Sequence, residues 1–118
     1  MAFRFEDLEI WKEAIEYSNV IYSITKKFPK DELFSLTNQL HRSANSISAN
    51  IAEGSGSSSD KDFSNYLSIS IKSLYETVSH LFIARKQNYI SDEDFRMLYQ
   101  SAENLSKRIR AFKFTLTK

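Results

Sequence analysis

Seven apolar residues near the end of the chain follow one another at alternating steps of three and four: Phe95, Leu98, Ala102, Leu105, Ile109, Phe112 and Leu116. This spacing is typical of an α-helix that packs one seam against other helices. Ser91 can cap the first turn together with Asp94, and Ile90 and Phe95 are placed to form a hydrophobic staple across it. The run therefore predicts a long helix and favours folds in which helices pack on helices.

The rest of the chain divides into three more helical stretches between stop signals. Proline follows Phe28 and disfavours helical geometry there, the loop 54–59 is rich in Gly and Ser, and Asn88 can adopt a left-handed turn. We also expect Gly54 to end its helix in the left-handed conformation. The predicted helices cover about residues 8–27, 30–53, 60–87 and 92–116.

Four helices of this length with short connections indicate a bundle. Only two Gly and one Pro among 118 residues favour uninterrupted helices over a turn-rich sheet. We expect an all-α protein in which residues 1–118 form one domain, an antiparallel up-and-down four-helix bundle.

The stretch 60–87 is apolar around most of its circumference. Its core seam consists of Phe63, Leu67, Ser70, Leu74, Thr77, Leu81 and Ala84. Further apolar positions lie outside that seam: Tyr66, Ile69, Ile71, Tyr75, Val78, Phe82 and Ile83. Because a bundle helix needs only one apolar stripe, we expect a second copy of the chain to cover the surplus. The alternative is that these side chains lie singly on the surface.

The stretch 30–53 carries a polar row beside its core row. The core row is Leu36, Leu40, Ala44, Ile47 and Ile51, and the polar row is Gln39, Arg42, Ser46, Asn50 and Glu53. Glu53 lies in the last turn, where the helix dipole disfavours a carboxylate, so it points to a specific partner. The predicted subunit interface therefore comprises Gln39, Arg42, Ser46, Asn50, Glu53, Tyr66, Ile69, Ser73 and Glu76. Plain solvated surface is the alternative for this row.

Charge is unevenly distributed although the formal net charge is only +1. Residues 6–16 contain the acids Glu6, Asp7, Glu9, Glu13 and Glu16, whereas residues 104–118 contain Lys107, Arg108, Arg110, Lys113 and Lys118. The two helices can neutralise each other, or the bases can bind phosphates. Under the second interpretation, RNA or DNA would contact Arg42, Lys72, Lys107, Arg108, Arg110 and Lys113.

Several motifs together resemble a known family. They are Phe5-Glu-Asp-Leu8 with Trp11, Phe28-Pro29, Asn50-Ile-Ala-Glu-Gly54, and then Phe63, Leu67, Ser73 and Glu76. These motifs are similar to those of the four-helix-bundle family encoded in 23S rRNA intervening sequences, also called the S23 ribosomal protein family. The resemblance implies a ring, commonly a homopentamer. It also implies a relation to the accessory protein of diversity-generating retroelements, which partners a reverse transcriptase and nucleic acid.

Two departures from that family bear on the nucleic-acid interpretation. Gly56 is followed by three serines where the family often has an arginine, which removes a cation from the loop and weakens the interpretation there. Lys72 stands where a glycine is frequent, which adds a cation to the stretch 60–87. The near-neutral net charge also differs from the basic retroelement proteins, so tight binding of phosphates is not expected.

The sequence offers no catalytic or metal-binding pattern. It has no cysteine, and its two histidines, His41 and His80, do not form the paired Glu-x-x-His motifs of a di-iron bundle. No phosphate-binding loop, nucleophile elbow, signal-peptide core or membrane-spanning apolar run is present. We expect a cytoplasmic, non-enzymatic homo-oligomeric scaffold without cofactor or membrane contact. The alternative is an RNA- or DNA-binding accessory protein that acts through rings of Arg and Lys.

Overall fold

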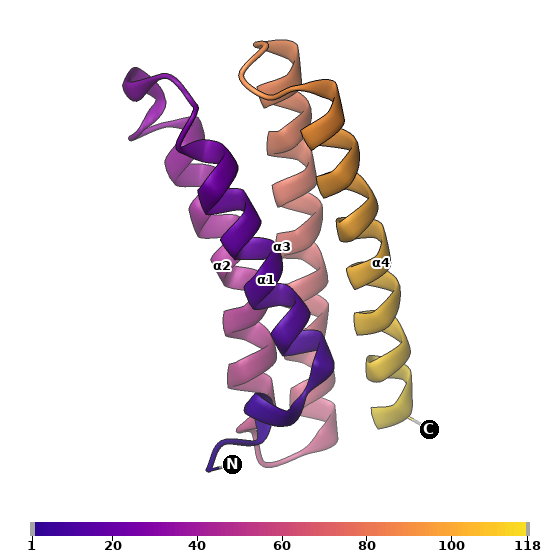
Figure 1. Ribbon diagram of the computed structural model, residues 1–118. Coiled ribbons are helices and arrows are strands. Elements are labelled where there is room, and N and C mark those ends of the chain that lie inside the picture. Colours follow the sequence, from indigo (N-terminus) through magenta and orange to yellow (C-terminus); the bar gives the residue numbers. More distant parts are fainter. Residues whose placement is uncertain (1, 118) are drawn as a thin grey trace.

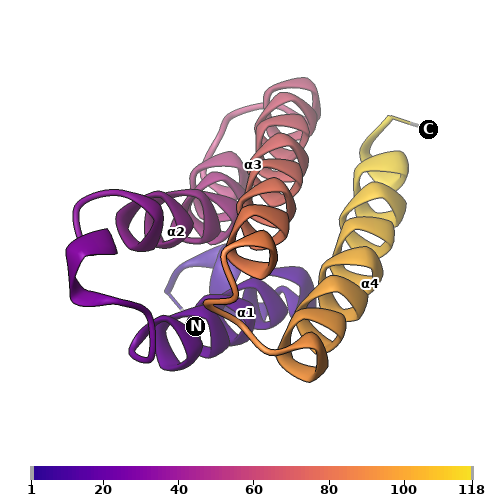
Figure 2. The same cartoon turned by 90° about the horizontal axis from the view of Figure 1, so that it is seen from above.

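The computed structural model describes residues 2–117, in which four α-helices lie side by side and run alternately up and down (Figure 1). Their bounds are α1 Glu9–Thr25, α2 Leu36–Ser55, α3 Asp60–Lys86 and α4 Asp92–Leu116. Two short 3₁₀ helices, η1 Arg4–Asp7 and η2 Lys30–Glu32, precede α1 and α2. Viewed from above, the helices occupy the four corners of the bundle (Figure 2). The predicted all-α antiparallel bundle is thus confirmed.

The predicted core seams are buried. All seven seam residues of α3, from Phe63 to Ala84, and all five core-row residues of α2, from Leu36 to Ile51, are buried. On α4 the seam is buried from Phe95 to Ile109, and its last two members pack against the core at its edge. Within residues 2–117, none of the helices is long and apolar enough to cross a membrane.

Local capping follows the sequence signals. The Ser91 and Ser59 hydroxyls each accept a hydrogen bond from a first-turn amide, of Asp94 and Asp62 respectively, at 3.1 Å. Asn88 has φ 61° and so makes the predicted left-handed turn between α3 and α4.

The predicted start of the second helix was wrong by six residues. Residues 30–32 form the 3₁₀ helix η2 instead, and α2 begins only at Leu36, because Ser35 has a non-helical backbone with φ −125° and ψ −105°. The Glu32 carboxylate accepts hydrogen bonds from the Leu36 amide at 3.3 Å and from the Tyr89 hydroxyl at 3.0 Å. It therefore caps α2 and joins the α1–α2 connection to the α3–α4 connection.

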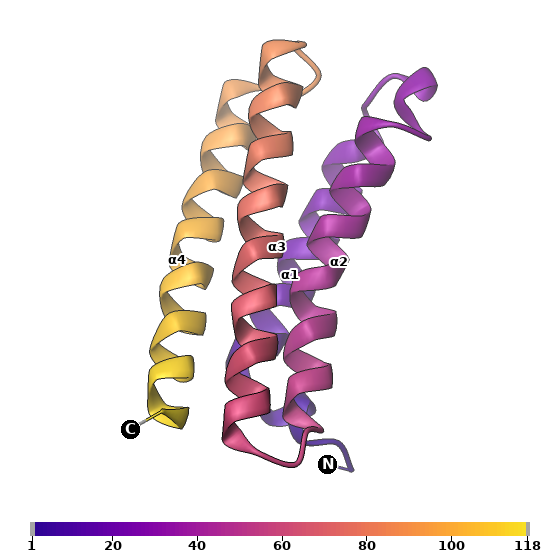
Figure 3. The same ribbon diagram turned by 180° about the vertical axis from the view of Figure 1, so that it is seen from behind.

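The predicted role of Gly54 was also wrong. α2 continues through this residue to Ser55, and neither glycine of the chain has a positive φ. A Cβ atom at Gly54 would lie 2.7 Å from Phe63 Cδ1 and 2.7 Å from Tyr66 Cβ. The glycine is therefore required for the close approach of α3 to α2, which lie side by side in the view from behind (Figure 3).

Candidate functional surfaces

A polar groove follows the line where α2 meets α3. It has a volume of about 370 Å³. It is lined by Gln39, Arg42, Ser43, Ser46, Ser73, Glu76 and His80. Five of these residues belong to the predicted subunit interface, so the fold gathers most of the predicted polar positions from two helices onto one surface.

Hydroxyl groups close the floor of this polar groove. The Ser73 hydroxyl donates to Ser46 Oγ at 2.8 Å, and Thr77 Oγ1 lies 2.8 Å from Ser43 Oγ. The Ser70 hydroxyl donates to the Ile47 carbonyl at 2.8 Å. We call these three contacts the hydroxyl ladder. Small side chains on both helices allow this contact, and the ladder satisfies polar groups that would otherwise be buried without partners.

The walls of the polar groove carry charge. His80 Nε2 lies 3.1 Å from Glu76 Oε2, and His80 Nδ1 is buried without a hydrogen-bond partner within the described chain. Asn50, one turn below the groove, donates to the Ser46 carbonyl at 2.8 Å. Gln39, Arg42 and Glu53 are exposed. Ser46, Asn50 and Ser73 are thus bonded inside the chain, whereas the exposed members of the row are available to a partner.

The outer face of α3 exposes apolar side chains that no other helix of the described chain covers. Ile69 is 46% exposed and Ile83 is 47% exposed, whereas Tyr75, which is 60% exposed, lies on the side toward α4 and contacts Arg110. Tyr66 is half-buried, since its Cβ lies against Gly54 of α2. The surplus apolar circumference predicted for this helix is therefore present only in part: the prediction was wrong for Ile71, which is buried in the core, and for Val78, which packs against it, because α4 covers that side of α3.

A cationic pocket lies between α3 and the second half of α4. It has a volume of about 440 Å³. Its lining residues are Ser68, Ile71, Lys72, Tyr75, Arg110 and Lys113. The Arg110 guanidinium donates to the Tyr75 hydroxyl at 3.2 Å and lies 5.9 Å from the centre of that ring. Exposed cations beside an aromatic ring can bind a phosphate and stack a base.

The six cations predicted for nucleic-acid contact do not form one surface. Lys72, Arg110 and Lys113 meet in the cationic pocket, but Arg42 lies in the polar groove on α2. Arg108 forms an ion pair with Glu13 of α1, so the predicted neutralisation between the first and last helices holds for this pair. Lys107 is exposed on α4.

An apolar groove between α3 and α4 was not predicted from the sequence. It has a volume of about 230 Å³. It is lined by Leu74, Tyr75, Val78, Tyr99, Ala102, Glu103 and Ser106. Phe82 meets Tyr99 edge to face at 6.2 Å and extends the apolar surface toward the α3–α4 connection. The sequence signal for this groove is the set of aromatic residues that recur at helical spacing in residues 60–87 and 92–116.

His41 belongs to a structural contact between α1 and α2. Its ring stacks on Tyr22 with the centroids 3.9 Å apart, and its Nε2 atom lies 2.8 Å from Thr25 Oγ1. Burial lowers the pKa of His41, because the charged ring would lose hydration there. Within residues 2–117, no cluster of three or more metal-ligating side chains brings either histidine together with acids.

Comparison with known proteins finds a matching family and similar solved structures. The model of the 23S rRNA-intervening sequence protein family matches residues 6–111. A crystal structure of a protein with unknown function, from the S23 ribosomal protein family of Bacteroides thetaiotaomicron VPI-5482, superposes with a TM-score of 0.81 at 26% sequence identity. That match covers 88% of this chain and 97% of the other. No functionally curated protein matches the chain.

Proposed function

Since the chain belongs to the 23S rRNA-intervening sequence protein family, we propose that it acts as a non-enzymatic homo-oligomeric scaffold in the cytoplasm. The family prediction made from the sequence is confirmed, and the relation to retroelement accessory proteins stays a prediction. The matching solved protein is itself described as having unknown function, so no family activity is carried over.

The observation that supports the scaffold is the uncovered outer face of α3. Ile69 and Ile83 are each about half exposed and lie two heptads apart, with Glu76 midway between them. Burying the exposed half of each isoleucine would contribute about 1 kcal/mol. This strip therefore exposes two separate apolar side chains with Glu76 between them, and a second copy is the simplest partner to cover both.

The polar groove beside this strip supplies directional contacts. Arg42 and Glu76 are exposed and carry opposite charges, so each can pair with an opposite charge on another copy. We propose a closed ring, because a contact between two different surfaces of the chain leaves one of each unused until the last copy closes the circle. The family resemblance favours five subunits.

Light scattering coupled to gel filtration tests the scaffold. The wild-type chain should have the mass of an oligomer, and Ile69→Asp or Arg42→Ala should lower that mass. Ile15→Asp is the matched control, since Ile15 is a similarly exposed isoleucine on α1. A wild-type monomer at micromolar concentration would contradict the proposal.

A second candidate function is binding of single-stranded RNA or DNA, and the cationic pocket supports it. Lys72, Arg110 and Lys113 converge beside exposed Tyr75, and a ring would repeat this pocket on every subunit. Affinity for a fluorescent RNA hairpin or oligonucleotide should fall steeply with salt. Lys72→Ala should weaken it, whereas Arg108→Ala should not, because Arg108 is paired with Glu13. The absence of binding at low salt would remove this candidate.

A further inference from the structure

We propose that Phe34 of each copy inserts into the apolar groove between α3 and α4 of a neighbouring copy. The inference rests on the proposed homo-oligomer and adds the contact that joins its subunits. It predicts that the two sides of the subunit contact are different surfaces of the chain.

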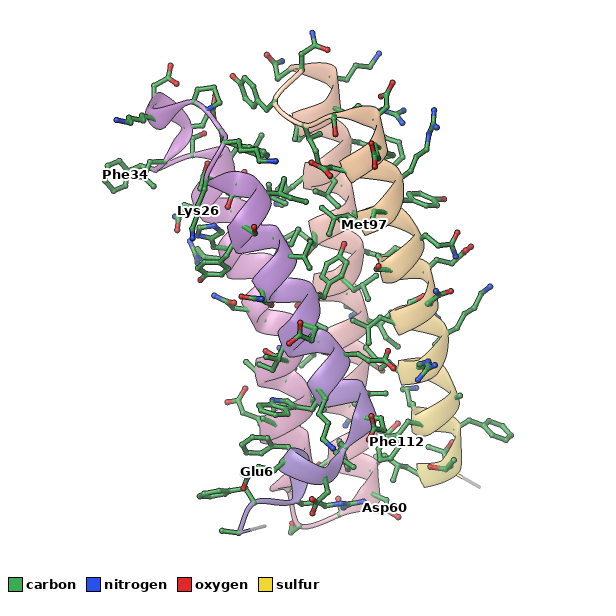
Figure 4. All side chains as sticks on the ribbon, viewed as in Figure 1. Glu6, Lys26, Phe34, Asp60, Met97 and Phe112 are labelled. Carbon is green, nitrogen blue, oxygen red and sulfur yellow. The ribbon has the colours of Figure 1, made fainter. Side chains whose placement is uncertain are left out.

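Phe34 is placed like an anchor for another molecule. Its side chain is 91% exposed, the highest value among the large apolar residues between positions 2 and 117, and its neighbour Leu33 is 52% exposed. In Figure 4 the Phe34 side chain points away from the bundle, at the end that also carries Lys26 and Met97. An aromatic ring held so far outside the core contributes little to the fold of its own chain.

The turn that carries Phe34 is held by hydrogen bonds on both sides. The Leu33 amide donates to the Lys30 carbonyl at 3.1 Å, and the Ser35 amide donates to the Glu32 carbonyl at 3.0 Å. The Glu32 carboxylate is itself held by the Leu36 amide and the Tyr89 hydroxyl. A preorganised turn loses little conformational freedom when its side chain docks, which favours binding.

The apolar groove fits such a ring in chemistry and in size. Val78, Tyr99 and Ala102 give it apolar and aromatic walls, and Glu103 and Ser106 give it a polar rim. Its volume of about 230 Å³ can hold one aromatic side chain. Aromatic pairs add edge-to-face or offset contacts to the burial of apolar area, and the exposed parts of Tyr99 and Phe82 can make them with a further ring.

The positions of these two surfaces require two copies. The α1–α2 connection with Phe34 protrudes from the side of the bundle that faces away from α3 and α4 (Figure 2), so Phe34 cannot reach the groove of its own chain. Tyr99, the groove residue nearest the start of α4, lies toward the same end of the bundle as Phe34, because α2 and α4 both begin there (Figure 1). Subunits arranged in parallel around one axis would place the two at similar heights.

The symmetry of the contact then favours a ring. A contact between two different surfaces leaves one unused anchor and one unused groove in any open assembly, and both are used only on closure. Phe34 directly precedes α2, so the contact continues onto the α2 surface that carries Gln39 and Arg42.

Substitution of Phe34 tests the inference. Phe34→Asp should convert the wild-type oligomer to a monomer in light scattering while its helical circular dichroism is unchanged. Phe114→Asp is the matched control, since Phe114 is 66% exposed on α4 outside the apolar groove, and it should keep the oligomer mass. If Phe34→Asp keeps the mass as well, the inference is overturned and the scaffold remains. A monomeric wild type would overturn both.

A mixing experiment tests the two-sided contact. Phe34→Asp keeps the groove and loses the anchor, whereas Tyr99→Glu keeps the anchor and loses the groove. Each should be monomeric alone, and an equimolar mixture should form a 1:1 heterodimer that grows no further. A mixture that stays monomeric would overturn the inference.

Cross-linking gives a readout that does not depend on how Tyr99→Glu folds. The chain has no cysteine, so the double variant Leu33→Cys, Glu103→Cys has thiols only beside the two predicted contact sites and keeps Phe34 and Tyr99 in place. Oxidation should produce a ladder of disulfide-linked chains that ends at the ring. Leu33→Cys with Phe114→Cys should give no ladder, and equal ladders from both variants would contradict the contact.

Discussion

Substitution of Gly54 by alanine tests the close packing of α2 on α3. The added Cβ would lie 2.7 Å from Phe63 Cδ1 and from Tyr66 Cβ, whereas ordinary contact begins near 3.4 Å. The Phe63 ring can rotate, but Tyr66 Cβ is fixed to the α3 backbone. The two helices must therefore separate locally by several tenths of an ångström, which would also stretch the hydroxyl ladder.

Two opposing effects set the magnitude of this change. Alanine is favoured over glycine inside a helix by up to about 1 kcal/mol, and less near a helix end. Overpacking of a tight site costs about 1–3 kcal/mol. We therefore expect Gly54→Ala to lower the free energy of unfolding by about 1–2 kcal/mol, which corresponds to a fall in Tm of roughly 5 °C for a chain of this size.

Thermal unfolding followed by circular dichroism measures this effect, with all variants at the same protein concentration because assembly shifts Tm. Gly56→Ala is the control, since the nearest atom to its Cβ would be the Glu53 carbonyl oxygen at 3.6 Å. It should match the wild type or melt slightly later. A Gly54→Ala protein as stable as Gly56→Ala would refute the argument from close packing.

Three further predictions concern single contacts. Glu32→Gln should lower the pKa of Tyr89, because the hydrogen bond to Glu32 and its charge raise that pKa, and ultraviolet titration at high pH should show one tyrosine ionising earlier. The pKa of His41 is lower in the folded chain than in the unfolded chain, so the unfolded chain takes up a proton first and wild-type stability falls as pH drops below about 6.5. His41→Gln should weaken this acid sensitivity. Urea unfolding midpoints at pH 7.5 and 5.5 measure the difference. Thr77→Val should cost about 1 kcal/mol in urea unfolding, because it leaves the buried Ser43 hydroxyl without its Thr77 contact, and an unchanged midpoint would contradict that.

The helix faces could be predicted because each depends on spacing within one segment. The seams of α3 and α4 and the caps at Ser59 and Ser91 follow from residues a few positions apart. These signals carry the periodicity of the helix and need no knowledge of tertiary contacts.

The errors concern residues whose role depends on distant partners. Glu32, which was expected inside the second helix, lies before α2 and is bonded to Tyr89, 57 residues away in the sequence. Gly54 appears to be a helix stop in the sequence, and only the approach of Phe63 and Tyr66 shows that its missing side chain serves packing. Local rules cannot anticipate either contact.

The surfaces were predicted in part. The cations and the polar row were identified residue by residue, but their grouping depends on the register between helices. That register brings Lys72 of α3 to Arg110 of α4 and leaves Arg42 in a different groove. The apolar groove between α3 and α4 depends on how far these two helices stand apart, which periodicity does not reveal.

The hydroxyl ladder between α2 and α3 fixes how these two helices align. A slip of one helical turn, about 5.4 Å along the axis, would move Gly54 away from Phe63 and Tyr66 and disturb the apolar packing. The same slip would separate Ser73 from Ser46, Thr77 from Ser43 and Ser70 from the Ile47 carbonyl at once, and would leave buried oxygens unsatisfied. Any rearrangement that accompanies assembly should therefore move α2 and α3 together as one rigid hairpin, and bending should concentrate where α1 and α4 join it.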